Sequence, residues 1–480
     1  MSNFITAFDD LLWSPLPFLK SVPLLGWLSP LAVLLVGTGI WFTFKTKFVQ
    51  VRYIKDAINN SFGTFSLHGK KEKNGLTSFQ ALVTAVAAQV GTGNVVGACG
   101  AILIGSPGAI VWMWIIAFFG MATIYAEAVL AQKTRVVNED GTISGGPVYY
   151  IKKAFPNKFG RFLEVFFAIA ITISLGCFGC MTLSNSISES SSNAFNIPTW
   201  IIALVVVILT ALVVLGGVNR IVTVAEKMVP IMAILYILGG LIVVIDKIEF
   251  IPETFALIFK SAFTPNAVIG GGAGYAIKQA ISQGAKRGLF SNEAGMGSTP
   301  HIHAYANVKR PHDQGLVAMM GMFIDTFVVI TFTALVVVST LYVNNGVLAN
   351  GACEGITKAN MAQIAFGSVF GQNIGSIFVA ICLIFFAFSS IIGWNLYGKL
   401  NLEYLFGKKV VPFYAVISLA FVFLGGIFSN DLVWELSDMF NMLMVLPNVI
   451  ALWALTKDVS DEAKRPSNKK ISEEINKEYL

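Results

Sequence analysis

Long apolar runs recur through most of this chain of 480 residues and constrain its fold more than any other feature. Several runs reach about 20 residues, the length that an α-helix needs to cross the hydrocarbon core of a bilayer. Charged residues make up only 12% of the sequence, about half the share that is usual in a soluble domain. The sequence therefore predicts an all-α polytopic membrane protein.

Apolar runs between charged clusters predict about eleven transmembrane helices. The expected spans are 26–46, 78–104, 108–132, 162–187, 198–218, 222–246, 276–306, 314–342, 373–398, 411–429 and 432–456. The seventh of these spans is the least hydrophobic.

Lys and Arg residues gather on one side of the predicted membrane, mainly in the loops after the first and third spans. The opposite side carries little beyond Lys20, Lys247, Lys260 and Lys358. Because basic loops stay in the cytoplasm, we expect the N-terminus outside and the charged tail 457–480 inside. The same distribution accounts for the net charge of +6 without a nucleic-acid partner, and it suits the plasma (inner) membrane.

The second span is interrupted in its middle, where segment 87–94 reads Ala-Ala-Gln-Val-Gly-Thr-Gly-Asn. Glycine costs roughly 1 kcal/mol relative to alanine inside a helix. Irregular backbone at membrane depth persists only where it is buried or lines a watery cavity. Small residues also mark close helix packing, but packing alone needs neither Gln89 nor Asn94. We therefore favour a broken helix here.

The seventh span has a similar interruption at 290–298, where polar residues crowd around Gly295 and Gly297. The alternative is a cytoplasmic loop, since Lys286 and Arg287 lie just before it. A loop leaves too few apolar residues to complete a span before Lys309, so we favour a second broken helix.

The two interruptions open two blocks of five spans, 78–247 and 276–456. Segment 1–77 precedes the blocks as one helix and a cytoplasmic loop, and 248–275 joins them outside the membrane. An odd number of spans gives the two blocks opposite orientations. Gly-interrupted segments at matching positions in two halves indicate the binding site of a transporter. The positive ends of half-helices suit a substrate carboxylate, and unwound carbonyls suit sodium.

Several motifs carry a resemblance to a known family. Stretch 105–120, which includes Gly105-Ser106-Pro107-Gly108, resembles the signature of the alanine or glycine:cation symporter family. Segments 89–94, 288–298 and 392–394 also match family patterns, and the resemblance covers essentially the whole chain. Ser106 and Val111 depart from the signature, which usually has a glycine and an aromatic residue there.

The resemblance implies a leucine-transporter-type fold, a five-plus-five inverted repeat preceded by one extra N-terminal helix. It implies sodium-coupled symport of a small neutral amino acid, alanine or glycine, by a monomer in the lipid bilayer. It implies no enzymatic activity and no cofactor, with sodium as the co-transported ion.

The resemblance also implies ligands for sodium. They are the carbonyls of Ala87, Val90 and Phe386 and the hydroxyls of Ser389 and Ser390. A single membrane serine more often bonds back to its own helix, but two adjacent serines facing the first break favour a sodium site.

For the substrate, the resemblance implies residues on both breaks. They are Gln89, Gly91, Thr92, Gly93 and Asn94 on the first, Gly295, Met296 and Gly297 on the second, and Trp394 as a cap. Trp394 and Met296 limit the volume, which favours alanine-sized side chains. Leu183 stands where family members have a glutamine, so glutamine or another amino acid remains open as the substrate.

Ionisable residues inside the membrane are functional hypotheses by default. Asp325 is a candidate for binding sodium or a proton, or for pairing with a basic group such as Arg287. Glu293 is a candidate for the cation, a gate or a helix cap. A proton-driven transporter of the same fold would use one of them. Glu127 is expected at the cytoplasmic interface, and Asp438 has no assigned role. We find neither the repeated pore loop of a channel nor a catalytic motif.

Overall fold

The computed structural model describes residues 29–62, 75–139, 142–264, 273–349, 351 and 354–464. Residues 1–28, residues 63–74 of the predicted cytoplasmic loop, residues 265–272 of the predicted 248–275 connection and residues 465–480 of the predicted tail lie outside this part. Apart from the strands β1 (Val136–Val137) and β2 (Ile143–Ser144), which form one hairpin, the described elements are helices.

The helices of the first half are α2 (Pro30–Lys45), α3 (Val49–Arg52), α4 (Ile54–Phe62), α5 (Ser78–Gln89), η3 (Thr92–Asn94), α6 (Val96–Gly105), α7 (Ala109–Thr134), α8 (Pro147–Ala154), α9 (Lys158–Ile173), η4 (Ser174–Gly179), α10 (Cys180–Phe195), α11 (Thr199–Val214), α12 (Gly217–Asp246), η5 (Ile248–Phe250) and α13 (Ile251–Phe263). Those of the second half are α14 (Ala273–Asn292), α15 (Pro300–Tyr305), α16 (Pro311–Met322), η6 (Phe323–Ile330), α17 (Thr331–Leu341), α18 (Met361–Phe370), α19 (Gln372–Phe406), η7 (Lys408–Val410), α20 (Val411–Leu424), α21 (Asn430–Ala454) and α22 (Thr456–Lys464).

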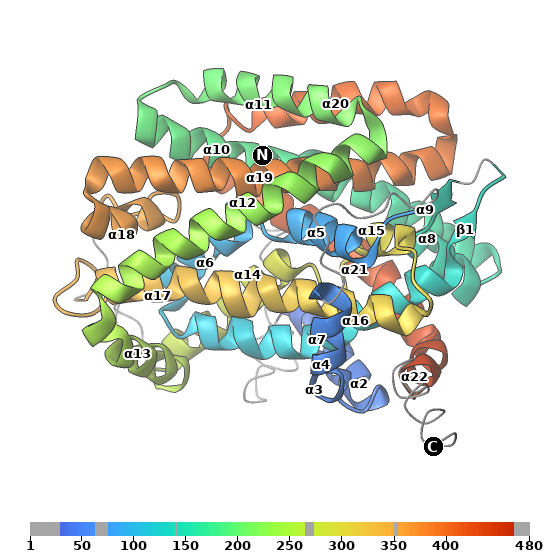
Figure 1. Ribbon diagram of the computed structural model, residues 1–480, viewed down its shortest axis with the longest axis horizontal. Coiled ribbons are helices and arrows are strands. Elements are labelled where there is room, and N and C mark those ends of the chain that lie inside the picture. The colour runs from blue at the N-terminus through green and yellow to red at the C-terminus, as the bar shows by residue number, and fades with distance from the viewer. Residues whose placement is uncertain are drawn as a thin grey trace, which may run out of the picture.

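Most long helices run in roughly one direction, with α13 and α18 at one end of the molecule and β1, α8 and α22 at the other (Figure 1). Each of the eleven predicted spans contains helix. Among the described residues, six helices are long and apolar enough to cross a membrane, or seven if the bent pair α5 and η3–α6 counts as one span. The chain is therefore a multi-pass membrane protein, and the count of eleven stays a prediction.

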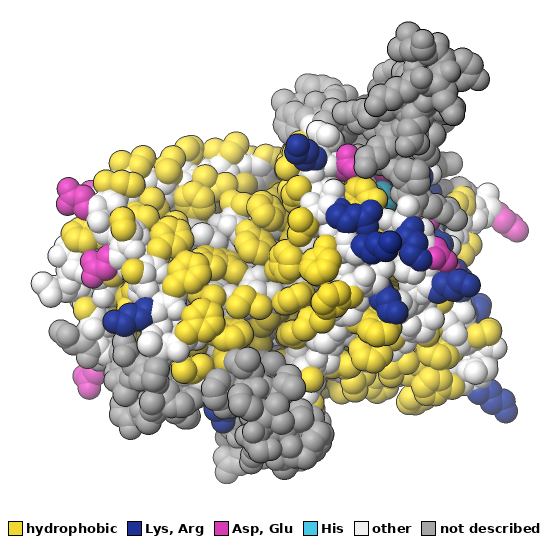
Figure 2. Space-filling model, turned by 90° about the horizontal axis from the view of Figure 1, so that it is seen from below, with side chains coloured by type: hydrophobic (Ala, Val, Ile, Leu, Met, Phe, Trp, Pro, Cys, Tyr) yellow, Lys and Arg dark blue, Asp and Glu magenta, His cyan; other side chains and the backbone are white. Residues whose placement is uncertain are grey.

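Apolar side chains are exposed on the outer surface of the bundle, where lipid would contact the helices. Helix α12 exposes Ile234, Leu238 and Ile245 on one side, while Tyr236 and Val243 on the other are buried. This spacing places one apolar stripe against the bundle and another toward the surroundings. Hydrophobic side chains cover the middle of the face in Figure 2, and Lys and Arg gather toward the end that holds β1 and α22.

The first break follows helix α5, which begins with a capping box between Thr77 and Gln80. Helix α5 ends at Gln89, one short 3₁₀ turn (Thr92–Asn94) follows, and α6 begins at Val96. The two halves are bent by 61° at this point. The predicted interruption of the second span is confirmed.

The second break lies between α14, which ends at Asn292, and α15, which begins at Pro300. Glu293, Gly295 and Gly297 have φ angles of 57°, 83° and 76°. These values belong to the left-handed region, which glycine enters without steric cost and other residues enter rarely. Residues 293–299 are buried between α14 and the short helix α15, which does not fit an exposed loop, and the crossing of the membrane by this pair stays a prediction.

Two π-helical segments lie inside long helices: η4 between α9 and α10, and η6 between α16 and α17. Such segments often mark functional positions in helices. Gly179, at the end of η4, lets Trp394 approach, since an added Cβ would lie 2.6 Å from the Trp394 ring. Asp325 lies in η6.

Candidate functional site

Two adjacent serines of α19 contact the end of α5. The Ser389 hydroxyl donates to the Ala87 carbonyl and to the Phe386 carbonyl, each at 2.9 Å. The Ser390 hydroxyl donates to the same two oxygens at 3.1 and 3.2 Å. Four of the five predicted sodium ligands therefore lie together, and all of them are buried.

Val90, the fifth predicted ligand, is the C-cap residue of α5 and directly precedes Gly91. An added Cβ on Gly91 would lie 2.6 Å from the Ser390 hydroxyl oxygen, so the break itself packs on α19. The group offers carbonyl and hydroxyl oxygens only, which are the ligands that hard cations prefer. Its chemistry fits sodium.

Asp325 joins the two breaks. Its Oδ1 accepts hydrogen bonds from Asn94 Nδ2 at 2.7 Å and from Ser291 Oγ at 3.1 Å, while Oδ2 accepts one from Thr326 Oγ1 at 2.8 Å. Asn94 belongs to the first break and Ser291 to the last turn of α14. The Asn94 side-chain oxygen in turn accepts from the Gly91 N–H at 3.0 Å.

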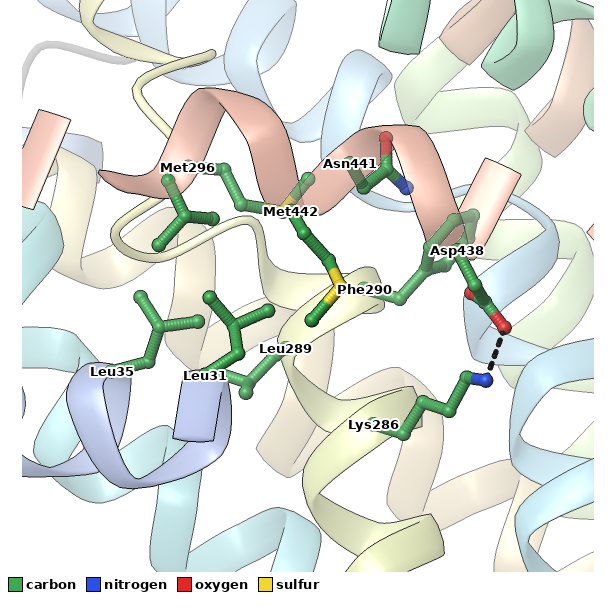
Figure 3. A pocket seen from close by; sticks show the side chains of 10 residues that line it. Leu31, Leu35, Lys286, Leu289, Phe290, Met296, Asp438, Asn441 and Met442 are labelled. Carbon is green, nitrogen blue, oxygen red and sulfur yellow. Dashed lines mark ion pairs between the residues drawn. The ribbon is translucent and has the colours of Figure 1, made fainter. Parts of the chain in front are cut away.

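The structure pairs Arg287 with Asp438 of α21 at 3.1 Å, and not with Asp325. Lys286 contacts the same carboxylate at 3.0 Å, beside a small apolar cavity lined in part by residues of α2 (Figure 3). The Arg287 guanidinium also lies 4.7 Å from the centre of the Trp434 ring. These contacts give Asp438 a structural partner and tie α14 to α21.

Gln89, a predicted substrate residue, bridges the breaks by donating to the Asn292 carbonyl at 3.1 Å. Gly93 lies against Ser291, where an added Cβ would meet the Ser291 Cα at 3.1 Å. Thr92 is buried beside them in η3. The predicted residues of the first break are therefore gathered around the end of α14.

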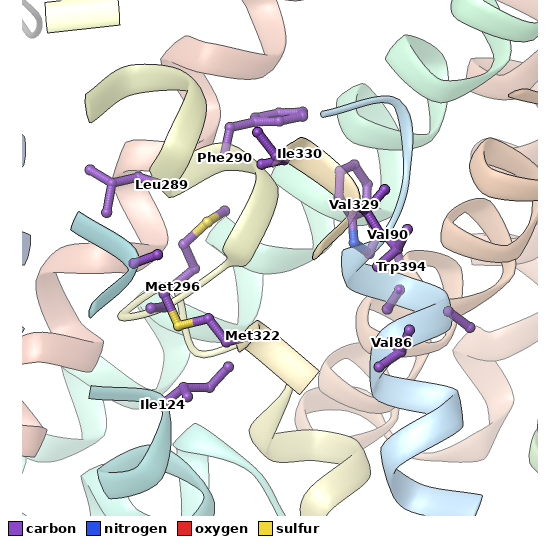
Figure 4. Close-up of a cluster of buried hydrophobic side chains, with 14 of the residues drawn as sticks. Val86, Val90, Ile124, Leu289, Phe290, Met296, Met322, Val329, Ile330 and Trp394 are labelled. Atoms are coloured by element: carbon purple, nitrogen blue, oxygen red, sulfur yellow. The ribbon is translucent and has the colours of Figure 1, made fainter. Parts of the chain in front are cut away.

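Trp394 contacts the second break through its side chain, because its indole N–H donates to the Glu293 carboxylate at 2.6 Å. Its ring also meets Phe290 at 5.9 Å between centroids. Met296 points into an apolar cluster that includes Leu289 and Met322 (Figure 4).

Gly295 and Gly297 use their backbone N–H groups to bind a protein carboxylate. The two groups donate to Glu127 of α7, at 3.3 and 2.9 Å. Glu127 is fully buried inside the protein, and its predicted place near the cytoplasmic interface stays a prediction. One sequence feature indicates that Glu127 is unusual, since it is the only acidic residue within the apolar run 109–134.

A cavity of about 770 Å³ opens at the end of the molecule that holds β1 and β2. Its walls include Leu76 before α5, Tyr305 at the end of α15, and Asn401 and Tyr404 of α19. It reaches His301, whose Nδ1 lies 2.7 Å from the Ser298 carbonyl in the second break. The cavity therefore approaches the breaks from the end rich in Lys and Arg.

Comparison with known proteins identifies the family. Residues 17–479 match the model of the sodium:alanine symporter family. The chain is 40% identical over 440 residues to the sodium/alanine symporter AgcS of Methanococcus maripaludis, covering 91% of this chain and 94% of the relative. It is 36% identical over 462 residues to the probable sodium/glutamine symporter GlnT of Bacillus subtilis, covering 96% and 89%.

A solved structure of a Na⁺-coupled sialic acid symporter has a similar fold. The TM-score is 0.50 at 10% identity, over 87% of this chain and 82% of that one. This likeness supports the fold of a Na⁺-coupled transporter and, at that identity, nothing finer. The family match and the 40% identical relative both cover nearly the whole chain. The chain therefore belongs to the sodium:alanine symporter family, a family of transporters and not of enzymes.

Proposed function

We propose that this protein is a sodium-coupled symporter that takes up a small neutral amino acid, with alanine or glycine as substrate. Family membership supports sodium and an amino acid as the transported pair. The observation that carries the proposal is the oxygen cluster of Ala87, Phe386, Ser389 and Ser390, which joins α19 to the first break.

Sodium binds at Ala87, Val90, Phe386, Ser389 and Ser390 in this proposal. The two serine hydroxyls contact the Ala87 and Phe386 carbonyls. An ion that takes these oxygens as ligands braces the end of α5 against α19. The backbone of the Gly91–Asn94 segment is then preorganised for the amino acid. By linkage, each ligand increases the affinity for the other by the same factor.

The amino acid binds between the two breaks. Gln89, Gly91, Thr92, Gly93 and Asn94 form one wall, and Gly295, Met296 and Gly297 lie on the other. Trp394 closes the side-chain pocket. The contact of Trp394 with Glu293, and the packing of Gly93 on Ser291, support this assignment because they bring the two walls together.

The membrane arrangement belongs to the same proposal. The chain crosses the plasma membrane eleven times as a monomer, with the N-terminus outside and the C-terminus in the cytoplasm. The blocks 78–247 and 276–456 form an inverted repeat joined by 248–275, after the segment 1–77 and before the tail 457–480. Lys and Arg at the end near α22 support this orientation.

Transport proceeds by alternating access. The buried ion pairs of Lys286 and Arg287 with Asp438 close the outer side. The cavity near His301 and Tyr305 gives water access from the cytoplasm. Opening of one side requires the other to close, so that the two ligands cross together.

A second candidate is proton coupling in the same fold, through Asp325 or Glu293. It is favoured by one observation, since both carboxylates are completely buried beside the breaks. A third is selectivity for glutamine, which the name of the relative GlnT and the presence of Leu183 raise.

Uptake of labelled alanine into proteoliposomes separates these functions. At fixed pH, we expect uptake to require external sodium, with choline as the control cation, and to be competed by glycine. Uptake that follows a pH gradient and ignores sodium would favour Asp325 or Glu293 as the coupling group. Sodium-dependent uptake of glutamine, with no uptake of alanine, would identify glutamine as the substrate and would still support coupling to sodium.

A further inference from the structure

One buried carboxylate contacts the second break without being one of the predicted sodium or substrate residues. Glu127 lies in α7, with no exposed surface, in a segment that is otherwise apolar. Taking a carboxylate out of water is costly unless several donors compensate it. A carboxylate in this position therefore implies a specific task.

The donors to Glu127 come from the second break and from α21. Gly297 N donates to Oε1 at 2.9 Å and Gly295 N to Oε2 at 3.3 Å. Asn448 Nδ2 donates to Oε1 at 2.6 Å and to the Gly295 carbonyl at 2.8 Å. Successive N–H groups in a turn of this kind form a concave site for anions. Glu127 fills that site from within the protein.

The contacts extend to the end of the molecule that holds the large cavity. The Tyr150 hydroxyl of α8 donates to the Asn448 side-chain oxygen, and both residues are fully buried. An added Cβ on Gly297 would lie 3.0 Å from Pro147, the first residue of α8. Tyr149, the neighbour of Tyr150, lines the cavity. The break is thus held between α7, α8 and α21.

We propose that Glu127 is a positioning residue of the transport site, an inference that rests on the transport function proposed above. Its carboxylate fixes the backbone of Gly295 and Gly297 in the shape that faces the substrate. It also occupies the anion site of the second break, so that the carboxylate of the amino acid binds at the first break alone. Asn448 of α21 donates a hydrogen bond that holds the Glu127 carboxylate in place.

The variant Glu127→Gln tests this assignment. An amide offers one oxygen and one NH₂ group, and so cannot accept from Gly295, Gly297 and Asn448 together. Glu164→Gln is the matched control, because Glu164 is also buried but bonds Arg161 and Tyr404. Asn448→Ala, which removes one donor and leaves the carboxylate, serves if Glu127→Gln does not fold.

Hydrogen exchange and the KM for alanine, both measured on purified full-length protein, test the role of Glu127. We expect Glu127→Gln to accelerate hydrogen exchange of the 290–299 segment at least tenfold and to raise the KM for alanine about tenfold, with Glu164→Gln unchanged in both. Asn448→Ala should change both readouts in the same direction by less. A purely structural residue would lower the amount of folded transporter and the maximal rate while leaving KM unchanged.

Unchanged exchange in the break would overturn the proposal, and so would faster exchange with an unchanged KM. If the wild-type protein takes up no alanine in sodium, the proposed function fails. Hydrogen exchange needs no substrate, and unchanged protection in Glu127→Gln would still refute the contact that the inference requires.

Discussion

Asn94 and Asp325 are 231 positions apart in the sequence, yet the Asn94 side-chain nitrogen donates a hydrogen bond of 2.7 Å to the Asp325 carboxylate. The same carboxylate accepts a bond from Ser291 at the end of α14. One side chain in the π-helical segment η6 therefore holds both broken helices. A movement of either break is therefore transmitted to the other through the hydrogen bonds of Asp325.

Asp325→Asn should reduce alanine uptake by about tenfold or more, because a hydrogen bond to a charged group contributes about 1.5–3 kcal/mol. An asparagine cannot accept from Asn94, Ser291 and Thr326 at once. The matched control is Asp246→Asn, at the exposed end of α12, where the carboxylate pairs only with its neighbour Lys247 among the described contacts. Equal uptake by wild type and Asp325→Asn in proteoliposomes would contradict this role.

Ser390→Ala should raise the half-saturating sodium concentration and the KM for alanine together, each by about tenfold, if one ligand is worth about 1.4 kcal/mol. Uptake measured over a grid of sodium and alanine concentrations gives both values. Ser339→Ala is the control, since Ser339 is buried and bonds the Val336 carbonyl of its own helix. A normal sodium requirement in Ser390→Ala would refute the site.

Asp438→Asn should lower the melting temperature of the detergent-purified protein by several degrees. Removal of one partner from a buried ion pair costs about 3–5 kcal/mol, and Asp438 neutralises both Lys286 and Arg287. Asp431→Asn offers a comparison on the same helix. The Asp431 side chain is 86% exposed, so the loss of its contact with Lys358 should change little. Similar melting of the two variants would argue against the buried ion pairs of Asp438 with Lys286 and Arg287.

Leu183→Ala should widen the pocket and increase the uptake of glutamine relative to alanine by roughly tenfold, since one methylene in an apolar pocket discriminates by about that much. Leu183 is buried against the first break, with its Cδ2 3.5 Å from the position of a Cβ on Gly91. Competition of labelled alanine uptake by glutamine measures the change. An unaltered ratio would place Leu183 outside the pocket.

The ion pairs of Asp458 in α22 predict that the stability of the protein depends on pH. Burial alone would raise the pKa of this carboxyl, but the ion pairs with Lys153 and Lys133 outweigh burial and hold the pKa below its usual value. Because the folded pKa is lowered, its stabilisation is present above the unfolded pKa of about 3.9 and is lost as the pH falls through the folded value. Asp458→Asn should melt below wild type at neutral pH, with the gap closing in acid. A constant gap would contradict the ion pairs.

Much of the fold follows from the sequence because membrane crossing leaves few choices. Every apolar run of the predicted length contains helix, and both Gly-x-Gly segments interrupt their helices. Gly295 and Gly297 have φ angles of 83° and 76° at the second break, a conformation that favours glycine. The two glycines in the sequence therefore predict the irregular backbone there.

Long-range side-chain pairing was much less predictable. The sequence identifies Asp325 and Asp438 as costly residues in apolar runs and predicts Glu127 at the interface, but nothing local selects the partners of these three residues. Arg287 pairs with Asp438 of α21 and not with Asp325 because the folded bundle brings the two side chains within 3.1 Å of each other, and this placement depends on the packing of the whole bundle. The role of Glu127 was missed for the same reason, since its donors lie about 170 and 320 positions away.

The most direct test of sodium symport is to ask whether the amino acid drives the ion. Proteoliposomes with equal sodium and equal pH on both sides receive an inward gradient of alanine, and labelled sodium is followed with the membrane potential clamped. Our account predicts transient accumulation of sodium that is reduced in Ser390→Ala at the same sodium and alanine concentrations. Alanine entry with no movement of sodium would contradict the account.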